Sequence, residues 1–168
     1  MKFFRDNSGR EWQVSVTIGT MKRVRALCDV DLYKIIEVDK NGKPNAELLE
    51  RLSTDPVLLV DVLYAVCKPE ADKLGVSDFD FGEALTGDTI EAAANALLDE
   101  LVDFFPEAKR QVFQKVLQAT RRFKAATEKQ LTAILTDPEL DARLESELKK
   151  LLDSSGSTPG SSASTPTA

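Results

Sequence analysis

Carboxylates are the residues of this chain that could do chemistry, because the sequence has no histidine and only two cysteines. The absence of histidine removes the usual Cys–His nucleophile and, together with the lack of spaced cysteines, a zinc site. Cys28 and Cys67 each lie among apolar residues of a predicted helix, so we expect two reduced, buried thiols rather than a disulfide. The sequence also has no Gly-rich phosphate loop, and we expect no catalytic, cofactor or metal site.

The acidic segment from Asp78 to Gly82 comes nearest to a metal-binding motif. An EF-hand loop requires glycine at its sixth position and a carboxylate at its twelfth. In this segment the glycine falls one position early, and Thr89 occupies the twelfth. The segment is therefore predicted to be a capped helix start. The run from Asp39 to Gly42 fails in the same way and is predicted to be a turn.

General acid–base catalysis needs carboxyl groups that are desolvated in a cleft, whereas pairs such as Asp29 with Asp31 are expected on solvated faces. Asp61 differs, because it is a lone carboxylate in an apolar helix. It could be buried with a raised pKa, exposed on a narrow polar stripe, or paired with Arg23 or Arg25. We favour the exposed and paired alternatives, since an unpaired buried charge is unfavourable. We expect that the protein is not an enzyme.

Composition fits one soluble domain: 168 residues, of which 42% are hydrophobic, with 22 basic and 28 acidic residues and a net charge of −6. An acidic balance argues against a general nucleic-acid binder. The longest apolar stretch is far below the ~20 residues that span a bilayer, and the N-terminus does not resemble a signal peptide. We expect a cytoplasmic protein that does not bind membranes.

Charge is distributed unevenly along the chain. Acidic residues dominate between Pro69 and Glu107, and basic residues dominate between Ala108 and Lys129. Neighbouring helices could neutralise one another, or one face could steer an oppositely charged partner. The clusters Lys22–Arg25 and Arg121–Lys124 could contact phosphates, but solvated helix faces explain them more simply.

The pattern of apolar residues predicts a mainly α fold, a multi-helix bundle with a short N-terminal β-hairpin and a disordered C-terminal tail. Alternation from Trp12 to Ile18 predicts a strand, and the turn sequence Asp6–Gly9 precedes it. Thr20 is predicted to cap the first helix, and Asp29 or Asp31 to begin a second, short one that includes Ile36.

The central helices follow from caps and apolar spacing. Asp39–Pro44 is predicted to be a solvent loop, and Asp55-Pro56 to open a helix that is apolar on nearly all sides and forms the centre of the bundle. Ser77 and Asp88 are predicted N-caps of two further helices. The second has an apolar face and an acidic back and ends near Pro106. Its predicted apolar face comprises Ile90, Ala93, Ala94, Leu97, Leu98, Leu101, Val102 and Phe105.

The C-terminal third is predicted to be helical. A long run over 107–136, with a bend or break, precedes Asp137-Pro138, which opens a last helix with a narrow row of leucines at Leu140, Leu144, Leu148 and Leu151. This row is the candidate partner-binding site: it could pack back on the bundle or lie in a partner's groove. We expect one helical domain with the hairpin over 1–136, a peripheral amphipathic helix over 137–153, and a disordered Ser/Thr/Pro/Gly tail over 154–168.

The order of these segments resembles a known family. The run GREWQVSVTIGTMKRVRALCDVDL, followed by DPVLLVDVLYAVCKPEADKLGVSDFDFGEALTGDTIEAAANALLDELVDFF, is similar to the tail assembly chaperones of long-tailed bacteriophages and their prophages. The resemblance covers about Gly9 to Thr120 and rests on packing and capping patterns, so no site residue carries over from it.

The resemblance implies a non-enzymatic protein that binds the tape measure protein, helps to recruit the major tail protein during tail assembly, and is absent from the mature virion. Family members are often made in two lengths by ribosomal frameshifting. Two alternatives remain: a structural subunit that stays in the virion or tail, with possible self-association through the hairpin edge, and a small nucleic-acid-associated regulator that uses the basic face from Lys109 to Lys129.

Overall fold

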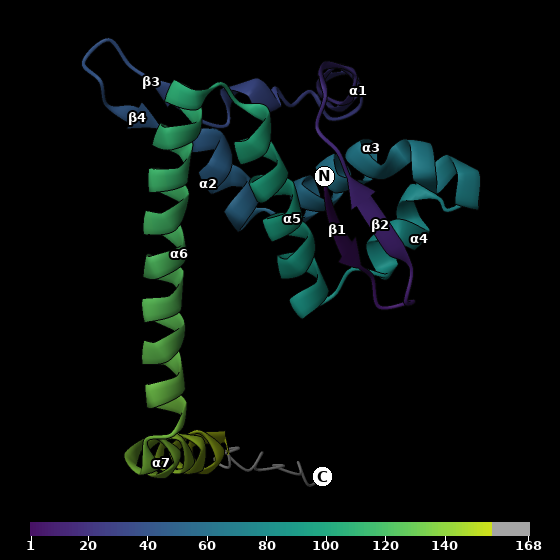
Figure 1. Cartoon of the computed structure of the whole chain (residues 1–168). Helices are drawn as coiled ribbons and strands as arrows, with labels where there is room; N and C mark the ends of the chain where they lie inside the picture. Colours follow the sequence, from purple (N-terminus) through teal and green to yellow (C-terminus); the bar gives the residue numbers. More distant parts are fainter. Residues whose placement is uncertain (156–168) are drawn as a thin grey trace, which may run out of the picture. The chain divides into compact units, whose positions relative to one another are not determined.

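In the computed structural model, which describes residues 1–155, the protein is mainly α-helical with an N-terminal β-hairpin, as predicted (Figure 1). The elements are, in chain order, β1 (Lys2–Arg5), β2 (Glu11–Val14), α1 (Ile18–Cys28), the 3-10 helix η1 (Leu32–Lys34), β3 (Glu37–Val38), β4 (Pro44–Asn45), α2 (Glu47–Thr54), α3 (Pro56–Leu74), α4 (Asp78–Glu83), α5 (Asp88–Phe104), α6 (Glu107–Leu135) and α7 (Pro138–Ser155).

The chain divides into two compact units, an N-terminal unit (Met1–Leu117) and a C-terminal unit (Gln118–Ala168). The division falls within α6, whereas the main domain was predicted to extend to residue 136. The N-terminal unit holds both hairpins, α1 to α5 and the first part of α6, and the C-terminal unit holds the rest of α6 and α7. The segment predicted to be disordered, 154–168, begins at the last two residues of α7 and otherwise lies outside the described residues.

The N-terminal hairpin pairs β1 with β2 in antiparallel register, with Phe4 opposite Trp12. Its apolar face packs on α3 and α5, which a two-stranded hairpin requires for stability. The predicted strand was too long, because the Thr17 side chain accepts a hydrogen bond from the backbone N–H of Thr20 and starts α1 at Ile18. Ile18 is consequently 59% exposed, and Thr20 lies inside the helix instead of capping it.

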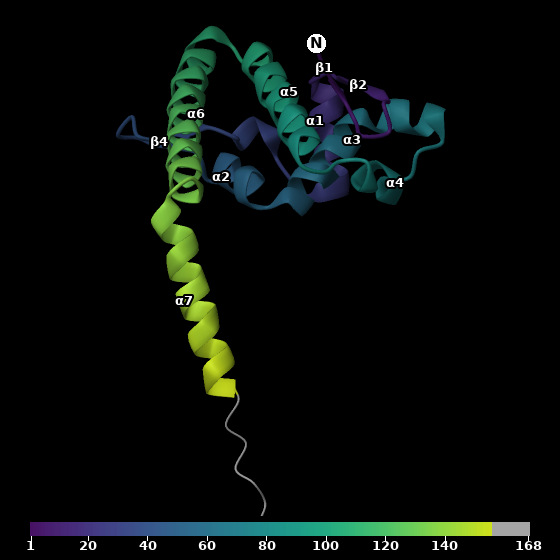
Figure 2. The ribbon, with the colours of Figure 1, turned by 90° about the horizontal axis from the view of Figure 1, so that it is seen from below.

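α3 forms the centre of the N-terminal unit, as its apolar sequence predicted, and contacts α1, α2, α4, α5 and β2 (Figure 2). Asp55 caps it by accepting a hydrogen bond from the backbone N–H of Leu58, with Pro56 at the first helical position. Gly75, with φ of 66°, ends it in the left-handed conformation that favours glycine. Val57 remains 69% exposed, so burial is confined to the faces that meet the other elements.

α4 and α5 confirm the predicted helix starts with one adjustment. Ser77 and Asp80 form a reciprocal capping box at α4, so the segment from Asp78 to Gly82 is a capped helix start as predicted. Asp88 is the first residue of α5, and Gly87 precedes it as the N-cap. The predicted apolar face of α5 is buried or half-buried, but Glu100 beside it is also buried, which was not predicted.

Aromatic rings join the hairpin to the helices in the core. The ring of Phe81 on α4 meets Trp12 edge-on at a centroid distance of 4.8 Å, Tyr64 at 5.6 Å and Phe4 at 6.4 Å. Trp12 is fully buried and Phe81 is 1% exposed. Such ring pairs stabilise a fold beyond the burial of their apolar area. One phenylalanine therefore supplies most of the anchoring of α4, which is only six residues long.

Two further predictions on local structure need correction, and a third is confirmed with one addition. α6 runs without a break from Glu107 to Leu135, because that segment contains neither proline nor glycine to interrupt it. The expected short helix reaching Ile36 is the 3-10 helix η1, which Asp31 caps. The predicted solvent loop over 39–44 is the exposed turn of a small hairpin formed by β3 and β4, so the turn predicted from Asp39 to Gly42 is confirmed and only Pro44 belongs to a strand.

Candidate interaction surface

The predicted leucine row lies on α7 and is largely exposed. Asp137 caps the helix by accepting a hydrogen bond from the backbone N–H of Glu139 at 3.0 Å, as the Asp-Pro pair predicted. Leu140 is half-buried, whereas Leu144, Leu148 and Leu151 are 53%, 59% and 64% exposed. Leu152 beside them is 71% exposed.

A second exposed apolar row lies on the C-terminal half of α6. In the first half of the helix, Phe113 and Leu117 are buried in the N-terminal unit. Helical spacing continues the same face through Phe123, Leu131 and Ile134, with Leu135 at its edge. These four side chains are 52–76% exposed, so the apolar stripe of α6 extends beyond the core that it helps to form.

This second row was not predicted from the sequence. Its only sequence signal is spacing: Phe123, Thr127, Leu131, Ile134 and Leu135 follow one another at the same intervals as the leucines of α7 together with Leu152. We define the C-terminal apolar surface as the exposed members of both rows. They are Phe123, Leu131, Ile134, Leu135, Leu144, Leu148, Leu151 and Leu152.

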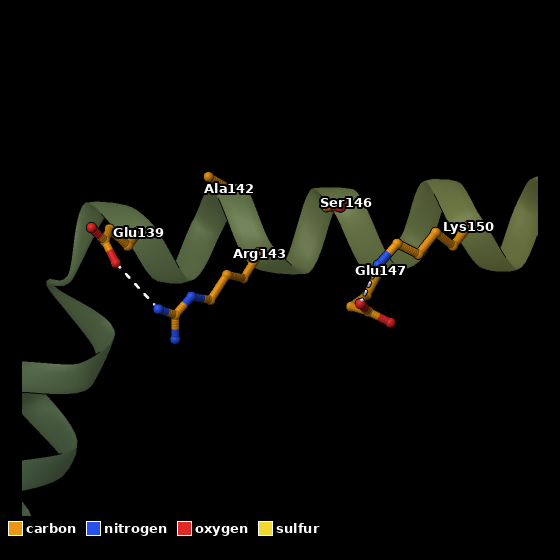
Figure 3. A pocket seen from close by; sticks show the side chains of 6 residues that line it. All are labelled: Glu139, Ala142, Arg143, Ser146, Glu147 and Lys150. Carbon is orange, nitrogen blue, oxygen red and sulfur yellow. Dashed lines mark hydrogen bonds and ion pairs between the residues drawn. The ribbon is translucent and has the colours of Figure 1, made fainter.

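The face of α7 away from the leucines is polar and self-paired (Figure 3). Arg143 pairs with Glu139 at 3.2 Å and Lys150 with Glu147 at 2.9 Å. With Ala142 and Ser146, these four residues line an open depression of about 420 Å³. Every lining group comes from one helix, so this depression provides no converging set of side chains from different elements.

The candidate carboxylate Asp61 is exposed on α3, in agreement with one of the two favoured alternatives. Partial burial, and then the charges of Asp78 and Asp55, raise the pKa of its carboxyl. The arginines considered as partners are engaged elsewhere: Arg23 donates hydrogen bonds to the carbonyls of Ala65 and Val66, and Arg25 pairs with Asp31.

The two cysteines are free thiols in different environments. Cys67 is 1% exposed, and burial raises its pKa to about 12. Cys28 is half-buried, and burial followed by the charges of Asp61 and Asp78 raises its pKa as well. The thiols were predicted to be reduced and buried, which holds fully for Cys67 and partly for Cys28.

Asp6, in the turn between β1 and β2, is a buried carboxylate that was not predicted from the sequence. It is 4% exposed and accepts hydrogen bonds from the backbone of Ser8, the backbone and side chain of Arg10, and the Trp12 indole N–H. Burial alone would raise its pKa, but the hydrogen bonds from Trp12 and Arg10 outweigh burial and lower it. The group is satisfied within its own hairpin, which indicates a structural role.

The basic face predicted from Lys109 to Lys129 is also partly structural. The Lys109 ammonium lies 3.9 Å from the centre of the Tyr33 ring and 4.5 Å from that of Phe105, and it donates to the Tyr33 carbonyl. Burial lowers the pKa of Lys109. This lysine therefore fixes the start of α6 on the N-terminal unit, and the exposed charges begin further along the helix.

Over residues 1–155, no group of three or more histidine, cysteine or acidic side chains is arranged to hold a metal ion. Within the same range, every helix is too short or too polar to cross a bilayer. Comparisons with protein-family models, with curated proteins and with solved structures found no match to this chain.

Proposed function

We propose that this protein is a tail assembly chaperone of a long-tailed bacteriophage or prophage, and that its C-terminal apolar surface binds the tape measure protein. The observation that carries the proposal is the exposure of two apolar rows at helical spacing on α6 and α7. A largely helical client presents stripes of the same periodicity, and helix-in-groove recognition pairs such faces.

The amount of exposed apolar surface supports a binding role. A fully exposed large apolar side chain presents roughly 100 Å² of apolar area, so the eight side chains of the C-terminal apolar surface, which are 52–76% exposed, together present roughly 500 Å² to solvent. The largest apolar patch of a typical soluble monomer, about 300–600 Å², is often functional, and the two rows together present an area of that order. The polar face of α7, with its two ion pairs, keeps the helix hydrated on the side away from its exposed leucines.

In this role the protein acts without catalysis in the cytoplasm of the bacterial host. It covers the apolar stripes of the tape measure protein before the tail polymerises, helps to recruit the major tail protein, and leaves before the virion is complete. The order of segments from Gly9 to Thr120, which resembles the chaperone family, supports this assignment of client.

Co-expression with a long, helical tape measure protein tests the proposal. We expect the client to become more soluble and to co-purify with the chaperone. Equal solubility of the client with and without this protein, and no complex, would refute the proposal. Mass spectrometry of purified particles provides the second arm, because a chaperone is absent from finished tails whereas a structural subunit is present.

A further inference from the structure

We propose that, in the absence of a client, a second copy of this chain covers the C-terminal apolar surface, with α6 of each copy packed on α7 of the other. The inference concerns the surface used in the proposed function but does not depend on the identity of the client. It rests on the spacing, the charge and the area of the two rows.

The two rows match in spacing. Phe123, Thr127, Leu131, Ile134 and Leu135 on α6 lie at the same intervals as Leu140, Leu144, Leu148, Leu151 and Leu152 on α7. Helices with equal apolar spacing can interlock side chains along their whole length. Apart from Leu140, the large apolar residues of both rows are more than half exposed in the described part of the chain. α6 and α7 of one copy therefore do not cover each other's apolar rows.

The two helices carry opposite charge. From Gln118 to Leu135, α6 has the basic residues Arg121, Arg122, Lys124 and Lys129 and the acidic residue Glu128. From Glu139 to Asp153, α7 has the acidic residues Glu139, Asp141, Glu145, Glu147 and Asp153 and the basic residues Arg143, Lys149 and Lys150. A contact between α6 of one copy and α7 of the other therefore joins net positive to net negative charge, whereas α6 on α6 would oppose like charges.

At the matched start of each row, the flanking residues are complementary. Arg122 and Lys124 flank Phe123 on α6, and Asp141 and Glu145 lie beside the leucine row on α7. A two-fold axis repeats the α6–α7 contact twice, because each copy contributes both helices. Self-complementarity of this kind favours a closed dimer over an open chain of copies.

The exposed area is sufficient for a dimer. Roughly 500 Å² of apolar surface per copy, before any polar flanking area is added, gives roughly 1,000 Å² for the pair. A specific protein–protein interface needs about that total. The surface lies in the C-terminal unit, so its association leaves the core of the N-terminal unit unchanged.

Sedimentation equilibrium of the full chain without client tests the inference. We expect the mass of a dimer. The double substitution Leu144→Asp with Leu148→Asp should raise the dissociation constant of the dimer by at least about 100-fold. Ala142→Asp with Ser146→Asp is the matched control, because it adds the same two charges on the opposite face of α7, and it should leave the dimer intact. Circular dichroism of each variant checks that the N-terminal unit remains folded.

Charge exchange between two copies tests the arrangement of the helices. One variant carries Arg122→Glu and Lys124→Glu, and the other carries Asp141→Lys and Glu145→Lys. Each alone should dimerise more weakly than the wild type, and their mixture should recover a mixed dimer. A monomer at every concentration would overturn the inference. A dimer indifferent to the leucine substitutions, or a mixture no tighter than the separate variants, would also overturn it.

Discussion

Replacing Asp6 by alanine should strongly destabilise the N-terminal unit. The carboxylate of Asp6 accepts four hydrogen bonds, two from backbone N–H groups at 2.9 Å and two through its other oxygen from the Arg10 side chain at 2.7 Å and the Trp12 indole at 2.8 Å. Its removal leaves a fully buried indole N–H and an arginine without their acceptor. Breaking one side of such a buried network costs about 3–5 kcal/mol of the free energy of unfolding.

The chain contains a matched control for this substitution. Asp39 holds the turn between β3 and β4 with the same bonds, from the backbone N–H groups two and four residues later, both at 2.8 Å, and each turn has a glycine with φ near 80°. Asp39 is exposed and water can replace its carboxylate. Asp39→Ala should therefore cost only about 0.5–1 kcal/mol, and the difference between the variants isolates the buried half of the Asp6 network.

Urea unfolding measures both variants, followed by circular dichroism and by the fluorescence of Trp12, the single tryptophan. The pKa of Asp6 is lower in the folded protein than its ordinary value of 3.8, so its contribution is present above that value and is lost as the pH falls towards the folded pKa. The difference in the free energy of unfolding between the wild type and Asp6→Ala should accordingly become smaller below about pH 4. Equal losses of unfolding free energy for Asp6→Ala and Asp39→Ala would refute the reasoning. A difference between the wild type and Asp6→Ala that does not change with pH would also refute it.

Three further changes have defined outcomes. Phe81→Ala removes the ring shared by Trp12, Tyr64 and Phe4 and should cost about 3–5 kcal/mol in urea unfolding; a loss below about 1 kcal/mol would show that α4 is not anchored through this ring. Asp55→Ala removes the cap of α3 and should cost about 1 kcal/mol in the same assay, whereas an unchanged midpoint would contradict the capping role. Iodoacetamide at pH 8 should modify Cys28 well before Cys67, because the buried thiol of Cys67 has a pKa of about 12. Peptide mass mapping measures the two rates, and equal rates would mean that Cys67 is accessible in the native protein.

The elements that could be predicted are those that depend on short-range signals. The Asp55-Pro56 and Asp137-Pro138 caps, the Ser77 cap and the apolar face of α5 follow from residues within one or two helical turns of each other. The strand from Trp12 to Ile18 was too long because alternation alone does not locate its end: the Thr17 cap overrides the β-branched pattern.

Burial of polar groups could not be predicted, since it depends on contacts between distant segments. Glu100 was expected on a solvated face, like the other carboxylates of its helix, yet its carboxylate lies against the backbone N–H of Val16 and the amino group of Met1. The candidate leucine row was predicted from spacing. The exposed row on α6 was overlooked because the apolar side chains in the first half of the same helix are buried. The sequence does not mark where this burial stops after Leu117.

The most direct test of the proposed role compares how much tape measure chain co-purifies with two variants of equal charge. The account predicts that Leu144→Asp with Leu148→Asp reduces the captured client at least about ten-fold, because two charges then occupy the apolar row. Ala142→Asp with Ser146→Asp, on the other face of the same helix, should capture as much client as the wild type. Equal capture by the two variants would contradict the claim that the exposed leucines of α7 bind the client.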